Sequence, residues 1–206
     1  MGGKVGIPIN EAVYLLNELE PDFLENARSK FPLLKSELIL GREGGEQEPS
    51  DELNLDRAEV MIKALDVAKK RADNELESIN KRIRASRKRR LWSQIASLIC
   101  SSGVLAAISL SQSALTVISA FLALLASIGT IISDHQEKLL KQGDGDIYVA
   151  YEEASQASYK AALMAENIRL LIKHRVANSE VSETLKSANA LCEDLNKWIT
   201  RMSGSS

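Results

Sequence analysis

The sequence predicts an all-α membrane protein in which a hairpin of two transmembrane helices is continuous with long cytoplasmic helices that form a bundle. Three observations lead to this class. Residues 91–133 form a run of 43 residues without Asp, Glu, Lys, Arg or His. The ten residues before this run carry seven positive charges and no negative one. All four prolines lie within the first 49 residues, so the rest of the chain can be helical without a proline break.

Residues 1–49 are expected to be a small N-terminal helical piece followed by a linker. Asn10 can cap a first helix, and Pro21 and Pro32 interrupt the helical pattern after it. The glycines and acidic residues of residues 41–52 are typical of a linker. The N-terminal piece therefore precedes the main helices as a separate segment.

Residues 50–90 are predicted to form a cytoplasmic stalk helix, which Ser50 or Asp51 can cap. Apolar or small residues at 3-4 spacing give it one buried stripe, which Lys69 interrupts. The stripe comprises Ala58, Ile62, Leu65, Ala72, Leu76, Ile79 and Ile83. Nothing breaks this pattern before the charge-free run. The stalk and the first span should therefore be one helix, of which about 60 Å stands outside the membrane.

The charge-free run is too long for one span, because a single helix of that length would measure about 65 Å, roughly twice a bilayer's hydrocarbon core. Its most polar point is SLSQS at residues 109–113, which predicts a turn between spans at residues 91–110 and 114–133. A soluble protein could bury such a hairpin, but soluble core helices usually carry charges on their outer face and these carry none. Release of the hairpin from a soluble form on a trigger is a third possibility.

The positive charges before the run form a cluster that we call the basic collar. It comprises Lys81, Arg82, Arg84, Arg87, Lys88, Arg89 and Arg90. By the positive-inside rule this end is cytoplasmic, and the hairpin returns the chain to the same side, which places both termini in the cytoplasm. Trp92 stands where an indole can anchor at the membrane interface. Because the collar adjoins a span, we expect it to bind anionic lipid headgroups rather than nucleic acid.

Residues 134–206 are expected to form cytoplasmic helices, with a break at Gly143 and Gly145 and a second boundary near residues 177–179. The first stripe comprises Ile147, Tyr151, Ala154, Ser158, Ala161, Ala165, Ile168 and Ile172. The second comprises Val181, Leu185, Ala188, Leu195, Ile199 and Met202. Together with the stalk these stripes predict a helical bundle below the membrane.

The residues that carry chemistry do not form a catalytic pattern. His135 and His174 have no Cys, His or carboxylate partner at a metal-binding spacing, and Cys100 and Cys192 lie far apart. Glycine-rich phosphate-binding patterns are absent from the sequence. We therefore expect no enzyme activity, no metal and no cofactor.

Small and hydroxylated residues recur along one side of each predicted span. They are Ser93, Ser97, Ser101, Thr116, Ser119, Ala123, Ser127 and Thr130. Such residues favour close packing of helices within lipid. They would also line a pore if several hairpins assembled with this side facing water. Both interpretations remain open at this point.

The basic collar, the hairpin and the returning helix together resemble the SLATT family across residues 51–172. The resemblance rests on RASRKRRLWSQIAS (residues 84–97) and LLASIGTIIS (residues 124–133). It implies a homo-oligomeric two-span effector of bacterial antiphage conflict systems, which forms a pore in the inner membrane when a separate partner protein senses a nucleotide signal. The alternative is a constitutive membrane-anchored scaffold that docks a cytoplasmic partner and forms no pore.

Overall fold

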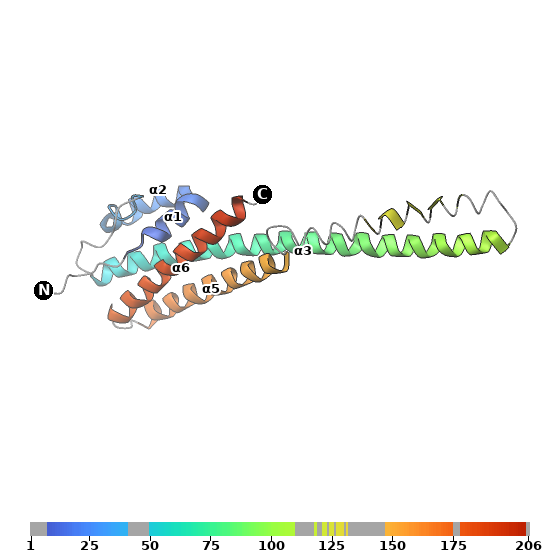
Figure 1. Cartoon of the computed structure of the whole chain (residues 1–206). Helices are drawn as coiled ribbons and strands as arrows, with labels where there is room; N and C mark the ends of the chain where they lie inside the picture. The colour runs from blue at the N-terminus through green and yellow to red at the C-terminus, as the bar shows by residue number, and fades with distance from the viewer. Residues whose placement is uncertain are drawn as a thin grey trace. The chain divides into compact units, whose positions relative to one another are not determined.

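The computed structural model describes residues 8–40, 50–109, 118, 121–122, 124–125, 127–129, 131, 147–174 and 178–204 (Figure 1). All regular structure within these residues is helical and none of it is strand, which confirms the all-α class. The chain divides into two compact units, of which the first contains residues 1–74 and 154–206 and the second contains residues 75–153.

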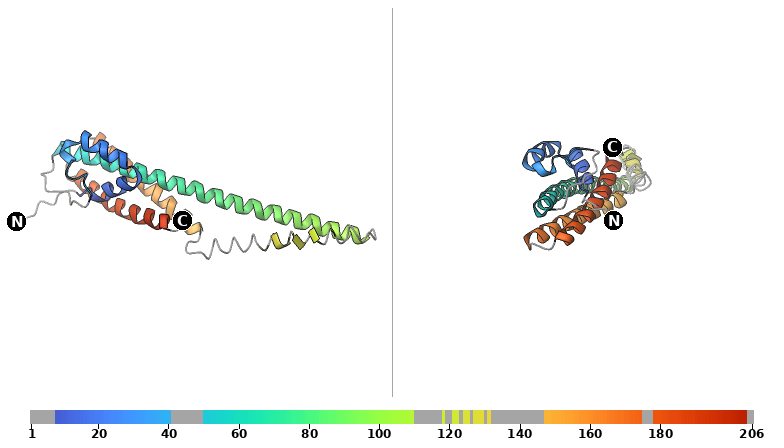
Figure 2. Two further views of the ribbon diagram at one scale, coloured as in Figure 1. Left: turned by 90° about the horizontal axis from the view of Figure 1, so that it is seen from above. Right: turned by 90° about the vertical axis from the view of Figure 1, so that its left-hand side faces the viewer.

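The N-terminal piece consists of α1 (Asn10–Leu19), α2 (Pro21–Lys30) and the short 3-10 helix η1 (Pro32–Leu34). Pro21 and Pro32 each occupy the first turn of a helix, where the missing N–H costs no hydrogen bond. Both prolines therefore end one helix and begin the next. α1 packs against α2 and against α6 (Asn178–Gly204), a helix from the other end of the chain (Figure 2).

The expected cap of α1 is wrong. Asn10 is the first residue of the helix rather than its cap, and Ile9 at the cap position makes no side-chain capping bond. The Glu11 N–H donates instead to Asn189 Oδ1 of α6 at 3.1 Å, and Asn189 Nδ2 donates to Asn10 Oδ1 at 3.2 Å. A side chain distant in sequence thus takes the place of a local cap.

The longest helix, α3, runs from Asp51 to Ser109 without interruption, as expected for a stalk continuous with the charge-free run. Ser50 caps it, because the Leu53 N–H donates to Ser50 Oγ at 3.2 Å. The predicted linker extended to residue 52, but α3 already begins at Asp51; residues 41–49 lie outside the described residues.

The last two helices are α5 (Ile147–Lys173) and α6, and the boundary expected near residues 177–179 agrees with the start of α6. The expected break at Gly143 and Gly145 lies outside the described residues. α5 runs antiparallel to the part of α3 in the first unit, because Ser158 bonds to Asp73 while Arg169 bonds to Asp66.

The core of the first unit is rich in alanine. Its fully or almost fully buried alanines are Ala12 of α1, Ala27 of α2, Ala58, Ala64, Ala68 and Ala72 of α3, Ala154, Ala157, Ala161 and Ala165 of α5, and Ala188 of α6. Small side chains at 3-4 spacing let helix backbones approach closely. The contact between the short side chains of Ser158 and Asp73, at 2.6 Å, is consistent with that close approach.

The predicted stripes identify most of this core but not all of it. Ala58, Leu65, Ala72 and Ile79 are buried, as are all predicted residues of α6 except the half-buried Met202. Tyr151 is exposed, which corrects its assignment to the buried stripe of α5. On α3, α5 and α6 the core also contains apolar residues that the stripes missed, namely Leu53, Val60, Met61, Ala64, Ala68, Ala157, Cys192 and Trp198.

A buried ion pair joins the segment after η1 to α3. Arg57 is fully buried and Glu37 is 4% exposed. Arg57 Nε donates to Glu37 Oε2 at 3.0 Å and Nη2 donates to Oε1 at 2.5 Å, while Nη1 reaches Asn54 Oδ1 at 3.5 Å. This two-point geometry is the strongest form of an ion pair. Loss of one partner would leave the other charge buried and uncompensated.

The substitution Glu37→Gln should lower the free energy of unfolding by about 3–5 kcal/mol, because Arg57 then stays buried without its counter-charge. Replacing the pair together, Glu37→Leu with Arg57→Met, should cost far less, since no charge remains unpaired. Chemical denaturation followed by circular dichroism measures both variants. Equal losses in the single and double variants would refute a role for charge pairing.

Candidate functional site

The basic collar lies on α3 in the second unit, and all seven of its side chains are exposed. Lys81 forms an ion pair with Glu77 one turn earlier at 2.7 Å, and this hydrogen bond lowers the pKa of the Glu77 carboxyl. Arg89 Nε donates to the Ala85 carbonyl at 3.4 Å. Seven positive charges within about 15 Å of helix produce a strong local positive potential. The collar is therefore an exposed, strongly basic surface.

Large apolar side chains follow the collar directly on the same helix and are exposed. Trp92 is 61% exposed and Leu98 is 71% exposed, and Leu91, Ile95 and Ile99 are exposed with them. At 100° per residue these five side chains occupy about a third of the helix circumference. Ser93 points away from that face and is half-buried. The outward side of this part of α3 is thus apolar.

The described residues between 118 and 131, which we call the returning arm, are helical and lie beside α3; we call the part of α3 after the collar the first arm. The described fragments of the returning arm lie along the end of α3 in Figure 2, and a Cβ added to Gly129 would come within 3.3 Å of Ser93 Oγ. The apolar residues described on this arm are exposed, namely Ile118, Phe121, Leu122, Leu124, Leu125, Ile128 and Ile131. The two arms therefore come together at Ser93 and Gly129, and the large apolar side chains described on both arms are exposed, as in helix pairs that pack within lipid.

The structure describes only some of the small and hydroxylated residues that the sequence places along one side of each predicted span. Ser93 faces the other arm, whereas Ser127 is exposed. Ser97 and Ser101 belong to α3, but their side chains are outside the description. The remaining members, Thr116, Ser119, Ala123 and Thr130, lie outside the described residues. Gly129 was not among the predicted residues, although its position within LLASIGTIIS and the preference of lipid-embedded helix pairs for glycine could have indicated it.

The predicted spans are described unequally. Residues 91–109 belong to α3, whereas most of residues 114–133 lie outside the description. Within the residues that the structure describes, no helix is both long enough and apolar enough to cross a membrane.

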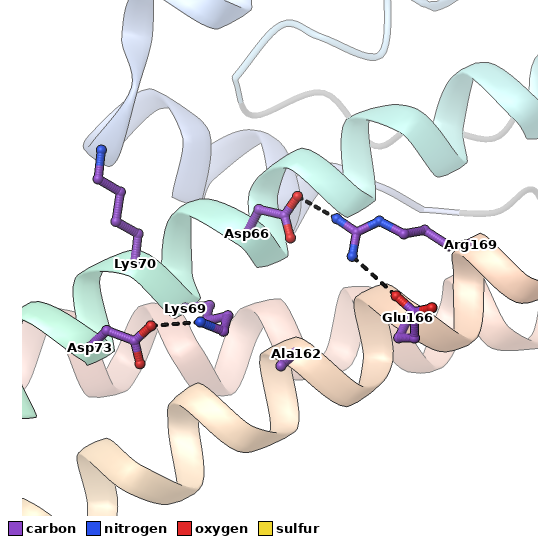
Figure 3. Close-up of a pocket in the computed structure, with 7 residues that line it drawn as sticks. All are labelled: Asp66, Lys69, Lys70, Asp73, Ala162, Glu166 and Arg169. Carbon is purple, nitrogen blue, oxygen red and sulfur yellow. Dashed lines mark hydrogen bonds and ion pairs between the residues drawn. The ribbon is translucent and has the colours of Figure 1, made fainter.

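A charged groove of about 630 Å³ lies between α3 and α5 in the first unit (Figure 3). It is lined by Asp66, Lys69, Lys70, Asp73, Ala162, Glu166 and Arg169. The apolar 3-4 periodicity of residues 50–90 does not predict this groove, because in that pattern Lys69 is only an interruption of the buried stripe. The i,i+4 spacing of opposite charges, Asp66 with Lys70 and Lys69 with Asp73, is a signal that could have indicated it.

Five of the six charged side chains of the groove pair with one another. Lys69 Nζ donates to Asp73 at 2.6 Å and Ser158 Oγ donates to the same carboxyl at 2.6 Å, and these two hydrogen bonds lower the pKa of Asp73. Arg169 donates to Asp66 at 2.6 Å, which raises the pKa of the guanidinium. Lys70 points away from the other labelled side chains (Figure 3). The groove therefore fastens α5 to α3 and does not present convergent unpaired groups to a ligand.

In the described part of the chain, no three His, Cys, Asp or Glu side chains lie close enough together to hold a metal ion. His174 is exposed, and His135 is outside the described residues. Cys192 is a buried free thiol whose Sγ lies 3.6 Å from Met61 Sδ. Burial, assisted by the negative charge of Glu11, raises the pKa of Cys192 to about 12. A thiol held protonated in this way is a poor nucleophile at neutral pH.

Comparison with protein-family models, curated proteins and solved structures finds no match for this chain. Its function must therefore be inferred from its own residues.

The contact between the two arms predicts that Ser93→Cys together with Gly129→Cys forms an intramolecular disulfide under mild oxidation. The Cβ position of residue 129 lies at a distance from the side chain of residue 93 that suits a disulfide. Mass spectrometry of the chain, in a Cys100→Ala background, measures the product.

The matched control is Ser93→Cys with Ile131→Cys, because Ile131 is exposed and points away from α3. The control pair should remain reduced. Equal yields of disulfide from both pairs would mean that the arms have no fixed register.

Proposed function

We propose that the chain is a non-catalytic, two-span effector that assembles in the bacterial inner membrane and permeabilises it. One observation carries this proposal: an exposed basic collar leads directly into a charge-free pair of helical arms whose large apolar side chains face outward. A lipid bilayer provides the two environments that this sequence of surfaces requires, first anionic headgroups and then hydrocarbon.

The outward apolar face is too large to be left in water. Soluble monomers rarely expose contiguous apolar patches above a few hundred Å², and burial of apolar surface is worth roughly 25 cal/mol per Å². Both arms of the hairpin expose leucine, isoleucine and an aromatic side chain, and no charge interrupts them. Transfer of this surface into lipid is the simplest way to remove it from water.

Permeabilisation is the step that requires assembly. One hairpin offers only two helices, so a water-filled passage needs several copies that turn their small and hydroxylated residues toward a common axis. Ser127, which is exposed on the returning arm, is the best described candidate for such a lining. The resemblance to SLATT proteins supports this proposal and adds a separate nucleotide-sensing protein as the activating partner.

The contact between Ser93 and Gly129 favours a second candidate function. In a membrane-anchored scaffold the small residues serve only to pack the two arms together, and the helical bundle of the first unit docks a cytoplasmic partner. This candidate shares the membrane, the anionic lipid contacts of the collar and the cytoplasmic termini with the effector. It differs in lacking a conducting state.

Membrane association can be tested directly, because a protein held by two apolar helices should stay with membranes through an alkaline carbonate wash. A peripheral protein held by charge alone is the control and should be released. Recovery of the unmodified protein in the soluble fraction would overturn both candidate functions.

The topology of the hairpin can be tested separately. Gln112→Cys, in a Cys100→Ala background, should react with an impermeant maleimide only from the outer side of the inner membrane.

Ser127→Leu should abolish ion leakage while leaving membrane retention and oligomers intact, because an added apolar side chain in a narrow lumen promotes dewetting. Leakage of a dye or of ions from cells or liposomes measures the effect, and crosslinking reports assembly. The matched control is Leu124→Met, a change of one large apolar residue for another on the same arm, which should not alter leakage. Stable oligomers that never leak, whatever the activating condition, would support the scaffold instead.

A further inference from the structure

The first two turns of α5 differ from the rest of the helix. They belong to the second unit, whereas α5 belongs to the first unit from Ala154 onward. Tyr148, Val149 and Tyr151 are exposed here, at 49%, 48% and 39%. We call these three residues the aromatic turn. Tyr151 follows the period of the buried stripe and is nevertheless exposed, so the core that buries Ala154 ends before it.

The aromatic turn lies at the level of the basic collar. α5 runs antiparallel to α3, and Ser158 of α5 bonds to Asp73 of α3. Ten residues back along α5 and ten residues forward along α3, about 15 Å from this bond, the two helices reach Tyr148 and Ile83. Ile83 stands within the collar, and the collar belongs to the same compact unit as the aromatic turn.

The residue types at this level suit the boundary of a bilayer. Tyrosine and tryptophan combine an apolar ring with one hydrogen-bonding group, and both are enriched where lipid headgroups meet hydrocarbon. The chain has four tyrosines and two tryptophans; two of the tyrosines stand within four residues in the aromatic turn, and Trp92 stands two residues after the collar. Aromatic residues thus accompany the positive charges on both α3 and α5.

Acidic residues limit this surface on its other side. Glu152 and Glu153 follow Tyr151 directly, and an anionic membrane surface repels carboxylates. Tyr159 is 66% exposed and lies eleven residues after Tyr148 on α5, which is about 16 Å along the helix and only about 20° around it. A contact between α5 and headgroups is therefore confined to the first two turns.

We infer that the aromatic turn of α5 is an interfacial anchor, which places its two tyrosine rings among the headgroups of the anionic bilayer that holds the hairpin. The inference rests on the proposed membrane insertion and adds a second contact with the same membrane, made by the chain after the hairpin. The collar supplies positive charge and the tyrosines supply apolar surface. Together they fix the start of α5 at the membrane surface.

The test uses the full chain in vesicles of phosphatidylcholine and phosphatidylglycerol, with Cys100→Ala as background. Tyr148→Cys carries an environment-sensitive fluorophore, while Cys192 stays unlabelled because burial raises its pKa to about 12. Lipids with a nitroxide on the headgroup should quench most of the emission from this label. Tyr159→Cys is the matched control, since it replaces the same residue type on the same side of α5, and it should keep its emission.

A second measurement tests whether the rings themselves hold the contact. With the fluorophore on Val149→Cys, the double substitution Tyr148→Ser with Tyr151→Ser should remove most of the headgroup quenching. Tyr148→Trp with Tyr151→Trp should preserve it, because tryptophan has the same interfacial preference. Circular dichroism should be unchanged in both sets, since the replaced side chains are exposed.

Equal quenching at Tyr148 and Tyr159, or no quenching at Tyr148, would overturn the inference. Quenching at Val149 that persists in the serine variant would also overturn it, because the rings would then not hold the contact. A label on Leu98→Cys, which is 71% exposed on the first arm, reports hairpin insertion through lipids with a nitroxide on the acyl chain. If Leu98 is quenched and Tyr148 is not, the anchor fails while insertion stands. If Tyr148 is quenched and Leu98 is not, insertion fails alone.

Discussion

Close packing of alanines is the constraint on which the first unit depends. A large side chain at Ala72 or Ala161 would separate helices that now approach closely. The ion pair between Arg169 and Asp66 and the hydrogen bond between Ser158 and Asp73 both require that approach, because short side chains such as serine and aspartate cannot bridge a wide gap. Exposed ion pairs contribute little to stability by themselves. They fix the register of α5 on α3 after the alanines have brought the two helices together.

The second unit applies the same small-residue principle to a different surface. Gly129 faces Ser93 between the two arms, so the arms approach closely at this point. The large apolar side chains point outward, which is the reverse of the first unit, where leucine and isoleucine fill the interior. In water this arrangement is unfavourable, whereas in lipid the outward face costs nothing and close contact between the arms becomes the main attraction. The proposed function follows from this inversion of inside and outside.

The sequence predicts the helices well, because a stripe repeats within one element and can be recognised without knowledge of its partner. This holds for the buried faces of α3, α5 and α6 and for the Ser50 cap, whose bond spans three residues. Contacts between distant segments left no such signal. Asn189 satisfies the Glu11 N–H from 178 residues away, and Glu37 pairs with Arg57 from outside its helix. Tyr151 follows the helical period of its stripe, but a period alone does not show where packing stops along a helix.

The contact between Asn189 and Glu11 has a consequence for the order of events during translation. Residues 1–74 leave the ribosome first, yet the unit to which they belong also needs residues 154–206. Between these two parts the ribosome delivers the entire charge-free run. Domains of a nascent chain generally fold as units once all their parts are available. The early helices must therefore wait, with their alanine faces uncovered, until the charge-free run and then residues 154–206 have emerged. Translation therefore delivers the charge-free run before the first unit has all the residues that it needs to fold.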